Sequence, residues 1–135
     1  MSSAAKPTIY VVDDDAGVLS SLRFLLETDG FSVRTFRSGG AALNAPYSGD
    51  VDCFVIDYRM PDINGIDLVG QLRNRGIDTP VVLITGYLDS YIAVRAEAAG
   101  VKHVMRKPLL DDILTKGIRA AIEEHRSTSP RAPMA

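Results

Sequence analysis

The sequence predicts an α/β protein built as a doubly wound, five-stranded parallel sheet with five flanking helices. Five short apolar segments, rich in β-branched residues, have the length and composition of strands. Segments with helical apolar spacing or helix-ending residues follow them in turn. Five repeats of strand then helix imply a parallel sheet with right-handed crossovers and helices on both faces.

The strands are expected at residues 8–12, 31–36, 53–56, 80–85 and 103–106. The third of them, Cys-Phe-Val-Ile, is wholly apolar and is typical of a buried strand. Cys53 is the only cysteine and is expected as a small buried side chain, so neither a disulfide nor a thiolate metal site is available.

The first two helices are predicted from apolar spacing and helix-ending residues. In the first, four apolar residues at spacings of four, three and one lie along one face, and Gly30 can end the helix. These residues are Val18, Leu22, Leu25 and Leu26. A short second helix is expected after Ser38, an N-cap type, and stops before Pro46.

The third helix is expected over residues 65–75 and the fourth over residues 90–99, each closed by a glycine, Gly76 or Gly100. Their inward-facing residues are expected to be Ile66, Val69 and Leu72 in the third and Val94 and Ala98 in the fourth.

The last helix should begin near Asp111 or Asp112, because acids suit the positive end of a helix dipole. Gly117 weakens this helix locally. Its apolar residues are Ile113, Leu114, Ile118, Ala121 and Ile122.

At 135 residues the chain has room for one ordinary domain, expected at residues 8–126 between flexible ends at 1–7 and 127–135. No apolar run approaches the roughly 20 residues that cross a bilayer, and the N-terminus does not have the pattern of a secretory signal. We therefore expect a cytoplasmic location without membrane binding. A net charge of −2 gives no electrostatic basis for direct nucleic-acid binding.

Polar residues follow the expected strands at one edge of the sheet. They are Asp13, Asp14 and Asp15 after the first strand, Asp57 after the third, Thr85 at the end of the fourth and Lys107 after the fifth. Ligands of such sheets bind beyond the carboxyl ends of the strands. Each residue alone could cap a helix or be solvated, but carboxylates gathered at one edge repel one another unless a cation lies among them.

The cation should be Mg²⁺ or Mn²⁺, because oxygen ligands without His or Cys favour hard ions, and Asp14 and Asp57 would bind it directly. A carboxylate beside such an ion, a hydroxyl and a lysine is what phosphoryl transfer to aspartate requires. Asp57 is the expected nucleophile because the apolar strand before it would hold it rigidly. Thr85 and Lys107 would then contact the phosphoryl group.

These residues lie in motifs that resemble those of response-regulator receiver domains, the CheY-like superfamily, and FixJ-like receivers in particular. The motifs are Val-Val-Asp13-Asp14-Asp15, Asp57-Tyr-Arg-Met-Pro61-Asp-Ile-Asn-Gly65, Thr85-Gly86 and Lys107-Pro108. The resemblance covers about residues 8–121 and implies a flavodoxin-like (βα)5 fold with strand order 2-1-3-4-5. It also implies a single-domain response regulator of a two-component phosphorelay, which takes a phosphoryl group from a sensor histidine kinase or histidine phosphotransfer protein and switches partner binding.

The resemblance also implies roles for individual residues. Asp57 accepts the phosphoryl group, Thr85 bonds it and Lys107 pairs with it. The metal is held by Asp13, Asp14, Asp57 and the backbone carbonyl of Arg59, and the Lys107–Pro108 peptide bond is expected to be cis. The only chemistry implied is Mg²⁺-dependent self-phosphorylation and autodephosphorylation, so the domain is not expected to be an enzyme acting on other substrates.

The chain departs from the family pattern at Val104, where receivers often have an aromatic switch residue. Arg59 and Tyr87 occupy positions that flank the phosphoryl group, and their bulk suggests that they lengthen the phosphorylated state by restricting water. The family further suggests kinase docking on the exposed part of the first helix, including Ser20 and Ser21, and a homodimer through the face formed by the fourth helix, fifth strand and fifth helix. The downstream target is unknown.

Two other classes of function remain open at this point. A phosphorylation-independent interaction module could keep the fold without the chemistry, although the complete acidic and basic set argues against it. A Mg²⁺-dependent phosphatase could also use an aspartyl nucleophile, but such enzymes usually place an acid two residues later, where this chain has Arg59. Neither glycine-rich nucleotide-binding motif follows the first strand.

Overall fold

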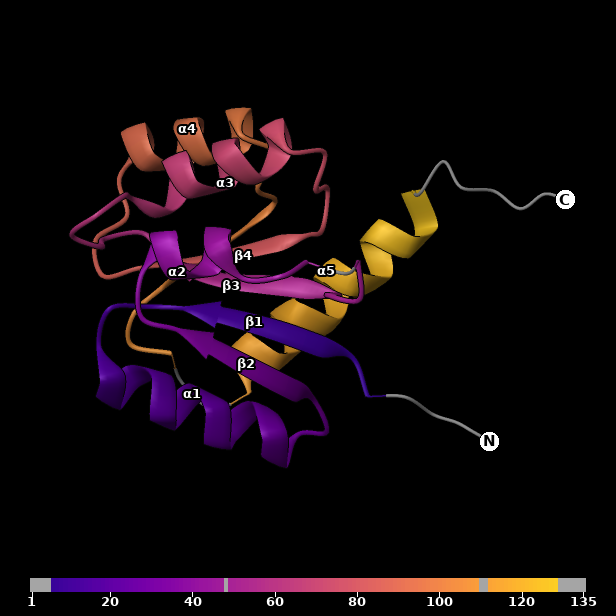
Figure 1. Cartoon of the computed structure of the whole chain (residues 1–135). Coiled ribbons are helices and arrows are strands. Elements are labelled where there is room, and N and C mark those ends of the chain that lie inside the picture. Colours follow the sequence, from indigo (N-terminus) through magenta and orange to yellow (C-terminus); the bar gives the residue numbers. More distant parts are fainter. Residues whose placement is uncertain (1–5, 48, 110–111, 129–135) are drawn as a thin grey trace, which may run out of the picture.

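A computed structural model describes residues 6–47, 49–109 and 112–128. It contains five strands and five helices in strict alternation (Figure 1). In chain order these are β1 Thr8–Val12, α1 Ala16–Thr28, β2 Ser32–Phe36, α2 Gly39–Asn44, β3 Cys53–Asp57, α3 Gly65–Asn74, β4 Val81–Thr85, α4 Ser90–Ala98, β5 His103–Arg106 and α5 Ile113–Thr128. The predicted strands are confirmed to within one residue at each end.

All neighbouring strands are parallel, and the sheet order is β2-β1-β3-β4-β5. This confirms the predicted fold class and strand order. Helices α1 and α5 cover one face of the sheet, and α2, α3 and α4 cover the other (Figure 1). Because the order reverses between β1 and β3, the loops after these two strands open away from each other and leave a crevice at their carboxyl ends.

Two apolar cores fill the space between the sheet and its two helix layers. Side chains of a strand alternate between the faces, so Ile9 and Val11 pack toward α1 and α5 while Tyr10 and Val12 pack toward the other layer. Cys53 is fully buried, as predicted, and burial raises the pKa of its thiol to about 12.

The buried face of α4 differs from the prediction. Ile92 and Ala96 are buried, whereas Val94 is 64% exposed and Ala98 is also exposed. The predicted pair lies two residues away from the observed pair, which is more than half a turn around a helix of 3.6 residues per turn. The error arises because α4 carries small or apolar residues on several faces, so its spacing alone does not select one.

The other helices agree more closely with the sequence. Ile66, Val69 and Leu72 of α3 are buried as expected, while in α1 Leu19 is buried and Leu25 only partly so. Gly76 and Gly100 follow α3 and α4 with positive φ values of 80° and 88°, a backbone region that favours glycine at helix ends.

Helix α5 begins one residue after the expected start at Asp112 and continues to Thr128, two residues past the boundary that we placed at 126. Of the flexible ends expected at residues 1–7 and 127–135, residues 1–5 and 129–135 lie outside the described residues, as does the alternative helix start at Asp111. None of the helices in the described ranges is long and apolar enough to cross a membrane.

Candidate active site at the carboxyl edge of the sheet

The three acids after β1 have separate environments. The Asp13 N–H donates to the carbonyl of Phe36 at 3.1 Å, which holds Asp13 between β1 and β2 with its side chain buried. Asp14 is exposed beside it. Asp15 is the N-cap of α1, and its carboxylate accepts the N–H groups of Gly17 and Val18. Only the first two acids are therefore free of helix capping.

Asp57 is the last residue of β3, and its side chain is only 6% exposed. The backbone on either side of it is fixed, because the Tyr58 N–H donates to the carbonyl of Ile84 at 2.7 Å and the Tyr58 carbonyl accepts the N–H of Gly65 at 2.8 Å. A side chain at Gly65 would place its Cβ 2.7 Å from the Asp57 carbonyl oxygen. The start of α3 can therefore pack directly against the end of β3.

Lys107 links the two buried acids. Its Nζ lies 3.1 Å from Oδ1 of Asp57 and 3.7 Å from Oδ2 of Asp13. The Lys107 N–H donates to the carbonyl of Thr85 at 2.8 Å, which extends the pairing of β4 and β5 to this residue. The Lys107–Pro108 peptide bond is cis, as the resemblance implied.

The carboxylates of Asp13, Asp14 and Asp57 each place an oxygen within 4.8 Å of the others. The structure thus brings together three of the expected metal-binding residues. Their donor atoms are all oxygens, two of the carboxylates are buried, and the Lys107 ammonium group forms ion pairs with these two. This donor set fits a hard divalent cation such as Mg²⁺, which commonly binds through few carboxylates and keeps several waters.

The pKa values in the cluster follow from burial and from the excess of three acids over one lysine. Burial raises the pKa of Asp57 and of Asp13, and the attraction of Lys107 reduces the increase without cancelling it. Burial alone would lower the pKa of Lys107, but its hydrogen bond to Asp57 and the charges of all three acids leave this pKa raised. The acids therefore carry a charge that the lysine neutralises only in part.

Thr85 is buried at the end of β4, but its hydroxyl does not reach toward the acids. It donates to the carbonyl of Tyr87 at 2.9 Å and accepts the N–H of Tyr87 at 3.2 Å. The hydroxyl is thus held in the turn that follows the strand. The Tyr87 side chain is 65% exposed, and the side chain of Arg59, two residues after Asp57, is also exposed.

Sequence reasoning did not single out Asp62, which lies in the loop after Asp57. Its carboxylate accepts the N–H groups of Gly40 at 2.9 Å and Gly39 at 3.4 Å, and these bonds lower the pKa of Asp62. The loop is thereby joined to the start of α2. No local sequence pattern indicates this contact, because the partners are more than 20 residues apart.

An open, largely apolar cleft of about 730 Å³ lies beside the acids. It is bordered by Val18, Ser21 and Leu22 of α1 and by Pro108 and Leu109 after β5. Ser21, which we expected on a docking surface, therefore lies within reach of the candidate site.

The family described as the response regulator receiver domain matches residues 9–119. The chain is 39% identical over 119 residues to the transcriptional regulatory protein FixJ of Bradyrhizobium diazoefficiens, covering 88% of this chain and 58% of FixJ. It is 36% identical over 126 residues to the response regulator protein TodT of Pseudomonas putida, covering 91% of this chain and 56% of TodT. The chain thus spans a little more than half the length of these relatives.

Solved structures agree with this likeness. The crystal structure of FixJ-N is 35% identical with a TM-score of 0.79, over 89% of this chain and 96% of that one. The structure of the response regulator StyR is 36% identical with a TM-score of 0.83, over 91% of this chain and 62% of that one. A CheY-like receiver from Methanospirillum hungatei JF-1 has a TM-score of 0.84 at 24% identity, over 91% and 98%, which shows the shared fold.

Proposed function

This chain belongs to the response-regulator receiver-domain family of two-component systems, and from this premise we propose that Asp57 accepts a phosphoryl group from a histidine kinase or a histidine phosphotransfer protein. One observation carries the proposal. A buried carboxylate at the rigid end of a central strand lies 3.1 Å from an ammonium group and within a cluster of three acids.

In the proposed reaction an Asp57 carboxylate oxygen attacks the phosphorus of a phosphohistidine. The new oxygen–phosphorus bond forms as the phosphorus–nitrogen bond breaks, and its electron pair returns to the imidazole of the donor. The strand and the bonds around Tyr58 hold the attacking oxygen in place. Lys107 neutralises charge on the transferred group from its position beside Asp57.

Asp13, Asp14, Asp57 and the backbone carbonyl of Arg59 would hold Mg²⁺ or Mn²⁺. When bound, such an ion would supply positive charge to the phosphoryl oxygens and relieve the repulsion among the acids. The three-carboxylate cluster supports this assignment, while the part of the Arg59 carbonyl follows from the family resemblance.

Thr85 would act as the switch. Its hydroxyl must give up the bond that it donates to the Tyr87 carbonyl before it can donate to a phosphoryl oxygen. A phosphorylated aspartate carries about one more negative charge and three acceptor oxygens, which favours this exchange and would shift the turn after β4. Because Val104 has no aromatic ring to reorient, we propose that the exposed Tyr87 carries the change to the surface.

The lifetime of the phosphorylated state would depend on Arg59 and Tyr87. Both side chains are exposed. The family resemblance implies that they flank the phosphoryl group, where they would obstruct a water molecule attacking phosphorus and releasing inorganic phosphate. Replacing both with alanine should accelerate the loss of the phosphoryl group, measured by radiolabel decay. Unchanged or slower decay would refute the idea.

The proposed kinase-facing surface is the exposed side of α1, including Ser20, Ser21 and Arg23, next to the apolar cleft.

A homodimer through α4, β5 and α5 is a further proposal, supported by exposed apolar side chains on α4 such as Val94. Whether the domain serves as a messenger, a phosphate sink or a relay intermediate depends on its partners.

The central test is phosphorylation by acetyl phosphate, followed by intact-mass and peptide mass spectrometry. The protein should gain one phosphoryl group at Asp57 in the presence of Mg²⁺ and none in the presence of EDTA. Asp57→Asn should abolish labelling, while Asp78→Asn, which changes an exposed acid at the opposite edge of the sheet, should not. Labelling at another residue would contradict the assignment.

The alternative is an interaction module that does not depend on phosphorylation. A pull-down of partners by the wild-type chain and by Asp57→Asn separates the two. Loss of binding in the variant supports a phosphorylation switch. Unchanged binding, together with no phosphoryl uptake in the first experiment, would favour the module.

A further inference from the structure

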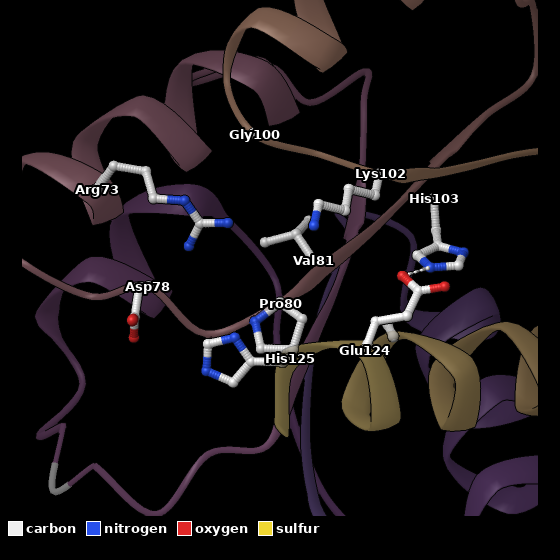
Figure 2. A pocket seen from close by; sticks show the side chains of 10 residues that line it. Arg73, Asp78, Pro80, Val81, Gly100, Lys102, His103, Glu124 and His125 are labelled. Atoms are coloured by element: carbon white, nitrogen blue, oxygen red, sulfur yellow. Dashed lines mark hydrogen bonds and ion pairs between the residues drawn. The ribbon is translucent and has the colours of Figure 1, made fainter. Parts of the chain in front are cut away.

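A second cavity lies at the opposite edge of the sheet, where β4 and β5 begin (Figure 2). It has a volume of about 300 Å³ and is bordered by the end of α3, the segments that lead into β4 and β5, and the last turns of α5. β4 runs from Val81 beside this cavity to Thr85 at the candidate active site. The length of a strand therefore separates the two sites.

Arg73 of α3 is a fixed cation at this cavity. Its Nη1 donates to the carbonyls of Ile77 at 3.0 Å and Thr79 at 2.8 Å, which hold the guanidinium in place. Burial lowers the pKa of Arg73, and the attraction of nearby Asp78 opposes this shift without cancelling it. Among the described residues, the N–H groups on its Nε and Nη2 have no protein acceptor.

Lys102 is a second cation, which extends into the cavity from the other side (Figure 2). Within the described ranges it forms no ion pair. The carboxylate of Glu124 on α5 is turned instead to Nε2 of His103, at 3.0 Å. Asp78 is the second acid of the lining, and His125 completes its charged or titratable groups.

The walls between these charged groups are apolar. Pro80 and Val81 lie beneath the cations (Figure 2), and Ala121 of α5 also lines the cavity. A site with converging donors above an apolar floor suits a ligand that has an anionic end and a small uncharged body.

We propose that this cavity binds a small phosphorylated metabolite, with its phosphate between Arg73 and Lys102 and its organic part against Pro80 and Val81. Guanidinium and ammonium groups are the usual protein partners of phosphate oxygens. The volume is at the lower end of the range for ligand pockets, about 300–1,000 Å³. The space therefore suits a sugar phosphate better than a dinucleotide.

The test is a ¹⁵N nuclear magnetic resonance titration of the full chain with ribose 5-phosphate, inorganic phosphate and ribose, in EDTA and at constant ionic strength. Ribose 5-phosphate should cause saturable shifts of the Gly100, Lys102 and His103 amides and of the Arg73 Nε–H, and ribose should cause none. Shifts that do not saturate, or that sodium chloride reproduces, would overturn the site. Equal affinity for inorganic phosphate would overturn the placement of an organic part on Pro80 and Val81.

Three variants make the assignment specific. Lys102→Gln changes an exposed side chain and should weaken binding about tenfold, because a hydrogen bond to a charged group is lost. Asp78→Asn should strengthen binding by about threefold, because a competing charge is removed. Lys116→Gln, an exposed lysine at the other end of α5, is the matched control and should have no effect. If Lys102→Gln and Lys116→Gln behave alike, the proposal is wrong.

Asp57→Asn separates this inference from the proposed phosphoryl acceptance. This variant should bind ribose 5-phosphate with wild-type affinity. A changed affinity of Asp57→Asn for ribose 5-phosphate, in either direction, would place the ligand at the carboxyl edge and overturn the second site.

Discussion

Asp13 and Asp57 are the buried carboxylates of the described residues. Burial raises the pKa of both, so the folded protein binds protons at these positions more tightly than the unfolded chain does. For an acid with a raised pKa, stability falls as pH rises from the ordinary aspartate range through the raised value. In the absence of a cation, this loss of stability is therefore fully present only at pH values above the raised pKa values.

Asp57→Asn should stabilise the metal-free protein. Asparagine has nearly the same shape as aspartate, and the substitution removes a buried negative charge. We therefore expect the free energy of unfolding to rise by on the order of 1 kcal/mol, or Tm by a few degrees, at pH 7. The gain should shrink as pH falls through the raised pKa of Asp57, because the wild-type acid is then also neutral. Thermal unfolding in EDTA at several pH values measures both effects. A lower Tm for the variant at pH 7 would mean that the ion pair with Lys107 outweighs burial.

At the scale of elements, helix packing determines which apolar residues matter. Ile92 and Ala96 of α4 face the sheet, while Val94 faces solvent. Helix α3 begins at Gly65, directly against the end of β3. Helix α5 has a glycine in its interior, Gly117, where an added Cβ would meet only the end of the flexible Met105 side chain.

Ile92 and Val94 of α4 give a matched pair of variants. Ile92→Ala should lower the free energy of unfolding by about 2–4 kcal/mol, because it leaves a cavity under the helix. Val94→Ala should change stability by less than about 0.5 kcal/mol, as exposed substitutions usually do. Denaturant unfolding measures the difference. Similar losses for the two variants would show that α4 packs on the face that the sequence first suggested.

Gly65 of α3 and Gly117 of α5 give a second pair of variants. Gly65→Ala should lower the free energy of unfolding by about 1–3 kcal/mol, because the Asp57 carbonyl and the Leu83 side chain leave no space for a methyl group. It should also slow phosphoryl uptake by displacing the end of β3. Gly117→Ala should be neutral or stabilise by up to about 1 kcal/mol, since alanine favours a helix and Met105 can move. Denaturant unfolding and acetyl phosphate labelling of both variants test this contrast.

For the whole molecule, the topology brings charge from three strands to one edge of the sheet. Asp13 follows β1, Asp57 ends β3 and Lys107 follows β5. These side chains meet only when the sheet has formed, so a cation that binds all the acids binds the folded state in preference to the unfolded chain. Metal binding and global stability should therefore be linked.

Mg²⁺ should raise the Tm of the wild-type chain in a concentration-dependent way. When the free Mg²⁺ concentration is a hundred times the dissociation constant, binding stabilises the folded state by about 2.7 kcal/mol. Asp13→Asn should reduce the Mg²⁺-dependent increase, and EDTA should reverse it. An equal increase in the wild type and in Asp13→Asn would exclude the acid cluster as the binding site.

The sequence by itself determined the fold class, the strands and the edge of the sheet at which the polar residues gather. It could do so because buried strands are recognised from local apolar runs, and because parallel strands must place their carboxyl ends together. The family resemblance added the strand order and the roles that we propose for Asp57, Thr85 and Lys107.

Only the tertiary structure decided which face of α4 is buried, that the Thr85 hydroxyl bonds within its own turn, and that Asp62 holds the loop after β3 against α2. It also brought Arg73 and Lys102 to one cavity at the far edge of the sheet. These features depend on which distant segments come into contact and on how each polar group finds a partner there. Local sequence periodicity does not encode such contacts, because they arise from packing between elements that are far apart in the chain.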